Sequence, residues 1–241
     1  SEIIQYRNQN TQTISPSQIV HSNLNGNYMT ESEFNHFKEA AETPIIHVPS
    51  NAQILLQTLN KAGYEAYLVG GCIRDAILQE PPHDWDICTN ATPEEIQQVF
   101  EDYPQLDIGI QHGTINVNSD NEWFDITSYR KDGIYKDGRR PSEVLFIKDI
   151  KEDLSRQDFT INAIAYANNH FVDPFEGRKD LKHKVICCVG NPDERFSEDA
   201  LRILRMYRFS LQMNFIIDHN TYVAAKKHLK ENVLDNVSAE R

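Results

Sequence analysis

The chain has 241 residues, of which 39% are hydrophobic, enough for one large domain or two small ones with a sizeable core. No apolar run is long enough to span a membrane, and the start SEIIQYRNQN lacks the basic and apolar regions of a secretory signal. The net charge of −12 argues against a general nucleic-acid coat protein, although basic residues cluster locally. Four cysteines match no zinc-site spacing and favour reduced thiols, so we expect a cytoplasmic protein with no membrane contact.

The first elements in the chain follow a polar segment. Residues 1–28 are rich in Asn, Gln, Ser and Thr without a sustained apolar period, which predicts a loosely ordered extension. Thr30 and Glu33 have the spacing of a capping box and indicate a short helix over about 31–42. From residue 51 onward, hydrophobic periods predict helices over 51–62, 72–78, 92–100, 152–167, 197–213 and 221–234, and strands over 65–70, 84–90, 113–119, 122–129 and 171–175.

These elements give a mixed α/β chain whose last quarter is helical. Pro93 belongs at the first turn of its helix, where a missing N–H costs nothing. The two strands between residues 113 and 129 alternate apolar and polar residues, and a turn at Asp120–Asn121 predicts a hairpin. The chain contains no internal repeat.

Two aspartates one residue apart, Asp84 and Asp86, occupy the predicted strand 84–90. Residues i and i+2 of a strand project from the same face, so the two carboxylates repel each other unless a cation lies between them. Mg²⁺ held by one or two carboxylates and by substrate phosphates is a common arrangement. The alternative interpretation is a surface D-x-D pair without a function.

Asp125 favours the metal-site interpretation. On the predicted strand 122–129 it shares one face with Trp123 and Thr127, while Phe124 and Ile126 face the other way. A third carboxylate on a neighbouring strand would complete a site for two metal ions. Such a site can clamp the attacking and leaving oxygens of a phosphoryl or nucleotidyl transfer, while one carboxylate helps to deprotonate the attacking hydroxyl.

A glycine pair precedes the acidic residues. Gly70 and Gly71 open a predicted helix, and backbone N–H groups at a helix N-terminus can receive a triphosphate. Arg74, one turn into that helix, would be aimed at the same anion. An isolated Gly-Gly is a weak signal, whereas Gly-Gly, Arg, D-x-D and a later strand Asp in this order are a strong one.

Three segments in order, VGGCIRD…HDWDI (69–87), SRQDFTINA (155–163) and SEDALRILRMYRF (197–209), carry a family resemblance. The chain resembles the class II tRNA nucleotidyltransferase and bacterial poly(A) polymerase family, within the polymerase-β-like nucleotidyltransferase superfamily, from about residue 50 to the C-terminus. The resemblance implies an α+β fold: a nucleotidyltransferase head with a mixed sheet and flanking helices, followed by an all-helical neck. We therefore expect an N-terminal extension over 1–45, partly disordered, a catalytic head over 46–180 and a neck over 181–241 that ends before the family's body and tail domains.

The resemblance also implies roles for single residues. Asp84 and Asp86 would be metal ligands, with Asp125 as the third catalytic carboxylate. Asp199 and Arg202, three apart on one helix face, would present a base-pairing edge to cytosine or adenine. The residues expected to bind the nucleotide are Gly70, Gly71, Arg74, Arg156, Asp158, Asn162, Asp199, Arg202, Arg205 and Arg208, with Asp158 beside the ribose 2′-hydroxyl and Arg205 and Arg208 toward the triphosphate.

The chain departs from the family pattern at one position and keeps a second feature of it. The family usually has Arg before the Asp of SRQDFT, where this chain has Gln157, and a neutral amide binds phosphate less strongly than a charged group. Residues 129–144 resemble the family's flexible loop, whose length argues against an enzyme that adds only the two Cs. The charged residues that we assign to this flexible loop are Arg130, Asp137, Arg139 and Arg140.

The predicted function is a Mg²⁺-dependent nucleotidyltransferase that adds CCA, or its terminal A, to the 3′ end of tRNA with CTP and ATP. The RNA 3′-hydroxyl attacks the α-phosphate and pyrophosphate leaves. Two close alternatives are an enzyme that adds only A and a poly(A) polymerase. An alternative from another class is an inactive nucleotide- or RNA-binding module. The sequence does not indicate the oligomeric state.

Overall fold

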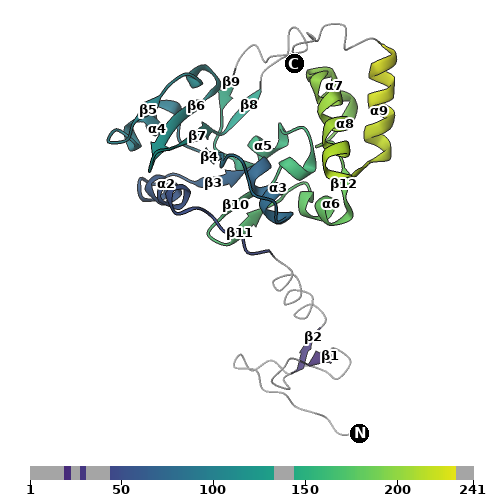
Figure 1. Cartoon of the computed structure of the whole chain (residues 1–241), viewed down its shortest axis with the longest axis horizontal. Coiled ribbons are helices and arrows are strands. Elements are labelled where there is room, and N and C mark those ends of the chain that lie inside the picture. Colours follow the sequence, from purple (N-terminus) through teal and green to yellow (C-terminus); the bar gives the residue numbers. More distant parts are fainter. Residues whose placement is uncertain (1–18, 23–27, 31–43, 133–143, 232–241) are drawn as a thin grey trace. The chain divides into compact units, whose positions relative to one another are not determined.

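The computed structural model describes residues 19–22, 28–30, 44–132 and 144–231 (Figure 1). Two compact units divide the chain, Ser1–Ile45 and Ile46–Arg241. In the first unit, β1 (Ile19–Ser22) and β2 (Tyr28–Thr30) pair in antiparallel fashion, which is more order than predicted for this polar segment. The helix predicted over 31–42 lies outside the described residues.

A seven-stranded mixed sheet forms the centre of the second unit (Figure 1). Its strand order is β11-β10-β3-β4-β7-β6-β5, and the pair β4 and β7 is parallel while the other neighbours are antiparallel. The strands are β3 (Ala66–Val69), β4 (Ile87–Thr89), β5 (Gln105–Leu106), β6 (Thr114–Ser119), β7 (Glu122–Ser128), β10 (Ala165–Ala167) and β11 (His170–Val172). A mixed sheet with flanking helices confirms the predicted fold class.

Helices precede, interrupt and follow the sheet in the chain. They are α2 (Ser50–Lys61), α3 (Gly71–Ile77), α4 (Pro93–Val99), α5 (Ile150–Ser155), α6 (Gly177–His183), α7 (Pro192–Glu198), α8 (Leu201–Met213) and α9 (His219–Lys230). Two small sheets pair β8 (Arg130–Asp132) with β9 (Val144–Phe146) and β12 (Val185–Ile186) with β13 (Ile216–Ile217). The strands β12 and β13 lie within the segment that was predicted to be all helical, so that prediction is wrong at these four residues. A strand of two residues is too short to show an alternating hydrophobic pattern in the sequence.

The predicted start of α4 is confirmed in detail. Thr92 caps the helix by accepting a hydrogen bond from the Glu95 N–H, and the Glu95 side chain accepts one from the Thr92 N–H. Pro93 occupies the first turn, as predicted. The helix is therefore specified locally, and it supplies the buried residues Pro93 and Ile96 to the core.

The β6–β7 hairpin is also as predicted, and it separates the core from the polar face of the sheet. Its turn residues Asp120 and Asn121 both have positive φ, +55° and +63°, as expected for the tight turn whose twist matches that of the strands. The helices α2 and α4 contact β6, and α4 contacts β7. The buried face of the hairpin consists of Ile115, Val117, Phe124 and Ile126. The alternate residues, including Asp125, therefore face away from this core.

The predicted strand 84–90 is too long. β4 begins at Ile87, so Asp84 and Asp86 lie in the segment that leads into it. The backbone still approaches β3 there, because the N–H of Val69 donates to the carbonyl oxygen of Asp86 at 3.0 Å. The ends of β4 are set by its pairing with β3 and β7. Because these partners are distant in sequence, the local pattern could not predict where the strand begins.

The helix predicted over 152–167 is wrong beyond Ser155, where α5 ends. The Asp158 carboxylate accepts from the next backbone N–H, that of Phe159, which offers the chain an alternative to helical hydrogen bonds. A single 3-10 turn over Thr160–Asn162 follows, and Ala165–Ala167 then form the strand β10 beside β3. Pairing with the central sheet overrides the helical pattern of this segment.

The helix predicted over 197–213 is two helices that meet at Asp199. Asp199 has extended backbone angles, and its carboxylate accepts a hydrogen bond from the N–H of Leu201 near the start of α8. Helices α7, α8 and α9 lie side by side (Figure 1), and α7 and α8 contact each other, as do α7 and α9. Within the described ranges, no helix is both long and apolar enough to cross a membrane.

Candidate active site

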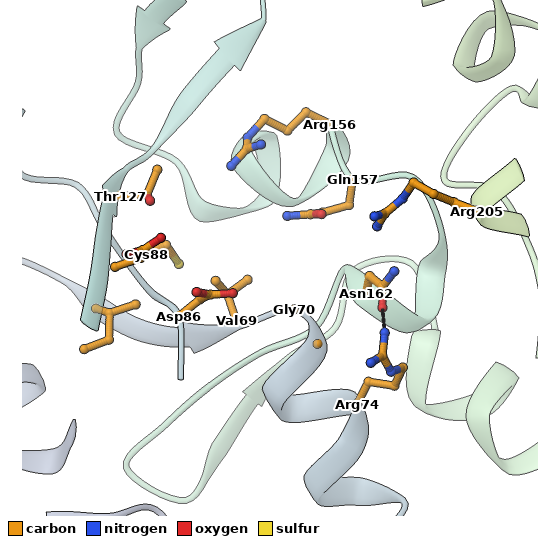
Figure 2. Close-up of a pocket in the computed structure, with 13 residues that line it drawn as sticks. Val69, Gly70, Arg74, Asp86, Cys88, Thr127, Arg156, Gln157, Asn162 and Arg205 are labelled. Carbon is orange, nitrogen blue, oxygen red and sulfur yellow. Dashed lines mark hydrogen bonds between the residues drawn. The ribbon is translucent and has the colours of Figure 1, made fainter. Parts of the chain in front are cut away.

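A pocket of about 310 Å³ opens where β3, β4 and β7 meet the first turn of α3 (Figure 2). Residues 156 and 157 after α5, the 3-10 turn and α8 complete its walls. The residues predicted from the sequence that line it are Gly70, Gly71, Arg74, Asp86, Asp125, Arg156, Asn162 and Arg205. Segments from five separate parts of the chain therefore converge on one cavity.

The acidic side of the pocket results from the parallel pairing of β4 with β7. Ile87 lies opposite Ile126, so Asp86 and Asp125, each one residue earlier, come next to each other. Burial, and after it the charges of Asp125 and Asp84, raise the pKa of Asp86 from 3.8 to about 6. Asn116, the cross-strand neighbour of Asp125, donates its side-chain amide to the Asp125 carboxylate. Two carboxylates thus crowd each other on one side of the cavity.

This donor set fits a hard divalent cation that is completed by a substrate. Oxygen ligands suit Mg²⁺, which commonly takes one or two carboxylates and fills its remaining positions with water and phosphate oxygens. A cation between Asp86 and Asp125 would offset both causes that raise the pKa of Asp86, its burial and its repulsion by Asp125. Among the described residues, no three His, Cys, Asp or Glu side chains lie together closely enough to hold a metal by themselves. Asp84 is exposed and does not line the pocket.

The glycine turn has a conformation that demands glycine. Gly70 has φ +81° and ψ −133°, a region that residues with a Cβ avoid, and its N–H donates to the carbonyl oxygen of Ile164. At Gly71 a Cβ would lie 3.5 Å from the guanidinium of Arg74. That distance is an ordinary van der Waals contact, so the backbone conformation demands glycine at position 70, while Gly71 packs beside Arg74.

A hydrogen-bonded chain of side chains crosses the basic side of the pocket, and Figure 2 shows its bond between Arg74 and Asn162. Arg205 Nε contacts Asp158 Oδ2 at 2.6 Å, and Asn162 Nδ2 donates to Asp158 Oδ1 at 3.0 Å. Arg74 Nη1 then donates to Asn162 Oδ1 at 2.7 Å, and Arg74 Nε donates to Asp75. Asp158 and Asn162 are buried, so these bonds fix the directions of both arginines. The predicted contact of Asp158 with a ribose stays a prediction.

Three arginines gather around one aromatic ring. The guanidinium carbons of Arg74, Arg205 and Arg208 lie 5.1, 5.2 and 5.2 Å from the centre of the Phe209 ring. Such contacts stabilise cations that would otherwise repel each other. Figure 2 shows Arg74, Asn162 and Arg205 on one side of the pocket and Asp86 and Thr127 on the other. A metal ion at the carboxylates would face the arginines across the pocket. An anion bound between them would therefore contact positive charge at both of its ends.

The structure does not bring Asp199 and Arg202 into this pocket, and the prediction that they share one helix face is wrong. Asp199 precedes α8, while Arg202 lies within it. Arg202 is buried and bonds to Glu198 at 2.5 Å and to the backbone oxygens of Arg195 and Arg156. An interrupted helix cannot present residues 199 and 202 as one row.

The remaining predicted residues have separate positions. Arg156 lines the pocket while it pairs with the buried Asp153 at 3.0 Å, and Gln157 lines it as well. Arg130, on β8, donates to the backbone oxygen of His112. The other loop residues, Asp137, Arg139 and Arg140, lie outside the described residues.

Sequence reasoning missed several residues that shape the site. Asn116 could have been found from the alternation of β6, which puts it on the same side of the hairpin as Asp125 once the turn is known. Phe209 gave no signal, because an aromatic residue in a periodic helix is usually a core residue. Cys88 lines the pocket, and burial raises the pKa of its thiol well above the ordinary value, so it is a neutral wall group.

The fold and the pocket define the class of nucleotidyltransferase head domains. The chain belongs to the family described as the poly A polymerase head domain, whose model matches residues 66–187. This match begins at β3 and ends within the segment after β12, so it includes the carboxylates, the glycine turn and the Asp158–Asn162 network.

Curated relatives that are named CCA-adding enzymes extend the similarity toward both ends of the chain. The CCA-adding enzyme of Enterococcus faecalis is 44% identical over 208 residues, which are 86% of this chain and 47% of that protein. The CCA-adding enzyme of Staphylococcus saprophyticus is 46% identical over 181 residues, 75% of this chain and 45% of that protein. The chain thus spans about half the length of the curated relatives that it matches.

Solved structures of similar fold contain nucleotides. The Bacillus stearothermophilus CCA-adding enzyme in complex with CTP superimposes with a TM-score of 0.65 and 36% identity, over 72% of this chain and 42% of that chain. A tRNA nucleotidyltransferase complexed with a primer tRNA and an incoming ATP analog superimposes with a TM-score of 0.62 and 26% identity, over 76% and 52% of the two chains.

Proposed function

We propose that this chain is a nucleotidyltransferase that adds CCA to the 3′ end of tRNA from CTP and ATP. The observation that carries the proposal is one pocket with adjacent carboxylates, Asp86 and Asp125, on one side and a fixed set of arginines on the other. Relatives called CCA-adding enzymes, at 44% and 46% identity, support the choice of tRNA as the substrate. Related structures with CTP, and with a primer tRNA and an ATP analog, support the choice of both partners.

The metal is part of the proposal. Nucleotidyltransferases of this family generally use a divalent ion, and we assign Mg²⁺ to Asp86 and Asp125, with Asp84 as a further ligand. When bound, the ion stabilises negative charge on the transferred phosphoryl group and on the attacking oxygen. Asp84 contributes negative charge near Asp86 and does not line the pocket.

The chain's own residues then bind and orient the substrates. Arg74 and Arg205, held by Asn162 and Asp158, receive the triphosphate, and Arg208 adds charge from the next turn of α8. Charge-assisted hydrogen bonds of this kind are about twice as strong as neutral ones. Pyrophosphate leaves toward these arginines, so the RNA 3′-hydroxyl attacks from the carboxylate side, where Asp125 accepts its proton.

Base selection and domain limits are proposed on the family resemblance. Asp199 and Arg202 would read cytosine or adenine, which requires Arg202 to exchange its bond with Glu198 for one with the base. The head is proposed to span 46–180 and the neck 181–241. Gln157, in the pocket where the family usually has Arg, lowers the expected affinity for the triphosphate.

An extension assay tests the proposal. The chain is incubated with Mg²⁺ and three tRNAs that end before CCA, after C and after CC, with CTP and ATP given separately and together. Growth that stops at CCA is the expected result, and Asp86→Asn and Asp125→Asn should abolish it while Asp102→Asn, an exposed carboxylate distant in sequence, should not. Growth only from the CC end would identify an A-adding enzyme, and unlimited A tails a poly(A) polymerase. Nucleotide binding that is unchanged by EDTA, without any extension, would identify a binding module.

A further inference from the structure

One face of the β5–β6–β7 part of the sheet is open and continues out of the pocket. On β7, Asp125 and Thr127 line the pocket, and Trp123, two residues before Asp125, projects from the same face beyond it. The opposite face is buried against α2 and α4. We define the open face by the residues Leu106, Asn116, Asn118, Trp123 and Asp125.

The cross-strand register arranges these residues in two rows. Asn116 lies between Leu106 of β5 and Asp125 of β7, and Asn118 lies opposite Trp123. Leu106 and Trp123 are 43% and 48% exposed, and both asparagines are half-buried. Within the described part of this face, Asp125 carries the only charge. The face therefore offers one aromatic plane, one aliphatic side chain and two amides next to the catalytic carboxylate.

The positions of the arginines and the carboxylates in the pocket indicate where the second substrate lies. At about 310 Å³ the pocket is at the lower end of ligand pockets. In the proposed reaction it holds the incoming nucleotide, and the RNA end lies beside it. The arginines that suit the triphosphate lie across the pocket from Asp86 and Thr127 (Figure 2). Because the attacking and leaving oxygens are roughly in line, the RNA must approach from the side opposite the arginines. That side is the open face.

We propose that the open face binds the last unpaired nucleotides of the RNA 3′ end, with one base stacked on the indole of Trp123. This inference rests on the proposed function. An exposed aromatic ring is the group on which proteins stack single-stranded bases, and every base has a face to offer it. Sheets that bind single-stranded RNA use aromatic residues on an open face in this manner.

The chemistry of the neighbours supports bases rather than phosphates as the ligand. Among the described residues that define this face there is no Lys or Arg to neutralise a phosphate, whereas the Asn118 amide can both donate to and accept from a base edge. Asn116 is already bonded to Asp125, so it positions the carboxylate while its neighbours bind the RNA. A residue two positions along a strand lies about 7 Å away, so a base on Trp123 is one nucleotide from Asp125.

Intrinsic fluorescence gives a direct test, because the chain has two tryptophans, Trp85 and Trp123. In a Trp85→Phe chain, Trp123 is the single reporter. It is titrated in EDTA without nucleotide, with a tRNA ending in CC and with the same tRNA lacking its unpaired 3′ nucleotides. We expect quenching by the first RNA and much less by the second. Equal signals from both RNAs, or none from either, would overturn the proposal.

Steady-state kinetics provide an independent measurement. Trp123→Ala should raise the KM for tRNA about tenfold, the scale of one lost base–aromatic stack, and leave the KM for ATP unchanged. Trp123→Phe should retain most of the affinity, since a ring remains. Ile54→Ala, equally exposed at 48% but on α2 behind the sheet, is the matched control and should change neither constant. An unchanged KM for tRNA in Trp123→Ala would refute the proposal.

The two measurements separate the failure of this inference from the failure of the proposed function. A wild-type chain that extends no RNA contradicts the proposed function, while RNA-dependent quenching of Trp123 would still support the binding face. Normal extension with a Trp123→Ala chain of unchanged KM would contradict the binding face alone. Concentration-dependent changes in Trp123 fluorescence without RNA would mark the face as a contact between copies of the chain and overturn the proposal.

Discussion

Replacing Asp86 with Asn should stabilise the metal-free protein while abolishing its activity. The Asp86 carboxyl is crowded by Asp125 and Asp84, and burial together with these charges raises its pKa from 3.8 to about 6. The folded state therefore disfavours the ionised form that the unfolded chain adopts freely. Asn has the same shape without the charge, so the substitution removes the repulsion and keeps the packing.

The magnitude follows from the shift in the pKa of Asp86. A difference of about two units corresponds to about 3 kcal/mol at a pH above both pKa values. Because Asp86 is exposed to solvent at one side, screening reduces this to about 1–2 kcal/mol. The cost is fully present above pH 6, declines as the pH falls toward 3.8 and vanishes below it. The advantage of Asp86→Asn is therefore largest at neutral pH.

Urea unfolding in EDTA at pH 7 and at pH 4 measures this effect. Asp86→Asn should unfold at higher urea concentration than the wild type at pH 7, and the difference should shrink at pH 4. Asp102→Asn, which removes an exposed carboxylate after α4, should change little at either pH. Added Mg²⁺ should stabilise the wild type more than Asp86→Asn. A variant that is less stable than the wild type at pH 7 would refute the argument that burial and repulsion make the Asp86 charge unfavourable in the metal-free protein.

Three further predictions concern the pocket and its supports. A Cβ at Gly177 would press on the carbonyl of Thr160, whose carbon lies at 2.8 Å, so Gly177→Ala should lose about 3 kcal/mol of unfolding free energy in urea. Gly190→Ala, with no atom within 4 Å and φ +67°, should lose only about 1 kcal/mol, and equal losses would contradict the packing reason. Arg205→Ala should raise the KM for ATP and CTP about tenfold or more, and an unchanged KM would exclude it from phosphate binding. Gln157→Arg should lower the same KM severalfold, as measured in the extension assay, whereas a higher value would mean that the pocket does not tolerate the added charge.

Local signals in the sequence determined the elements whose stability is local. The capping residues Thr92 and Glu95 with Pro93 predicted the start of α4, and the alternation around Asp120–Asn121 predicted the β6–β7 hairpin with Asp125 on its polar face. Hydrogen bonds within a few residues and a two-residue side-chain period cause both features, so they can be read without knowing the rest of the fold.

Tertiary structure decided which predicted residues meet. The pairing of Asp86 with Asp125 requires β4 to lie parallel to β7, and the fixed direction of Arg205 requires Asp158, 47 residues earlier. The same long-range pairing turned the expected helix after Ser155 into the strand β10. Periodicity records only which face of an element is apolar. Hydrogen bonds and charges between distant segments depend on how the chain packs. The sequence therefore indicated Arg74 and Arg205 as phosphate-binding residues, but the hydrogen bonds through Asn162 and Asp158 that join them emerged only from the folded protein.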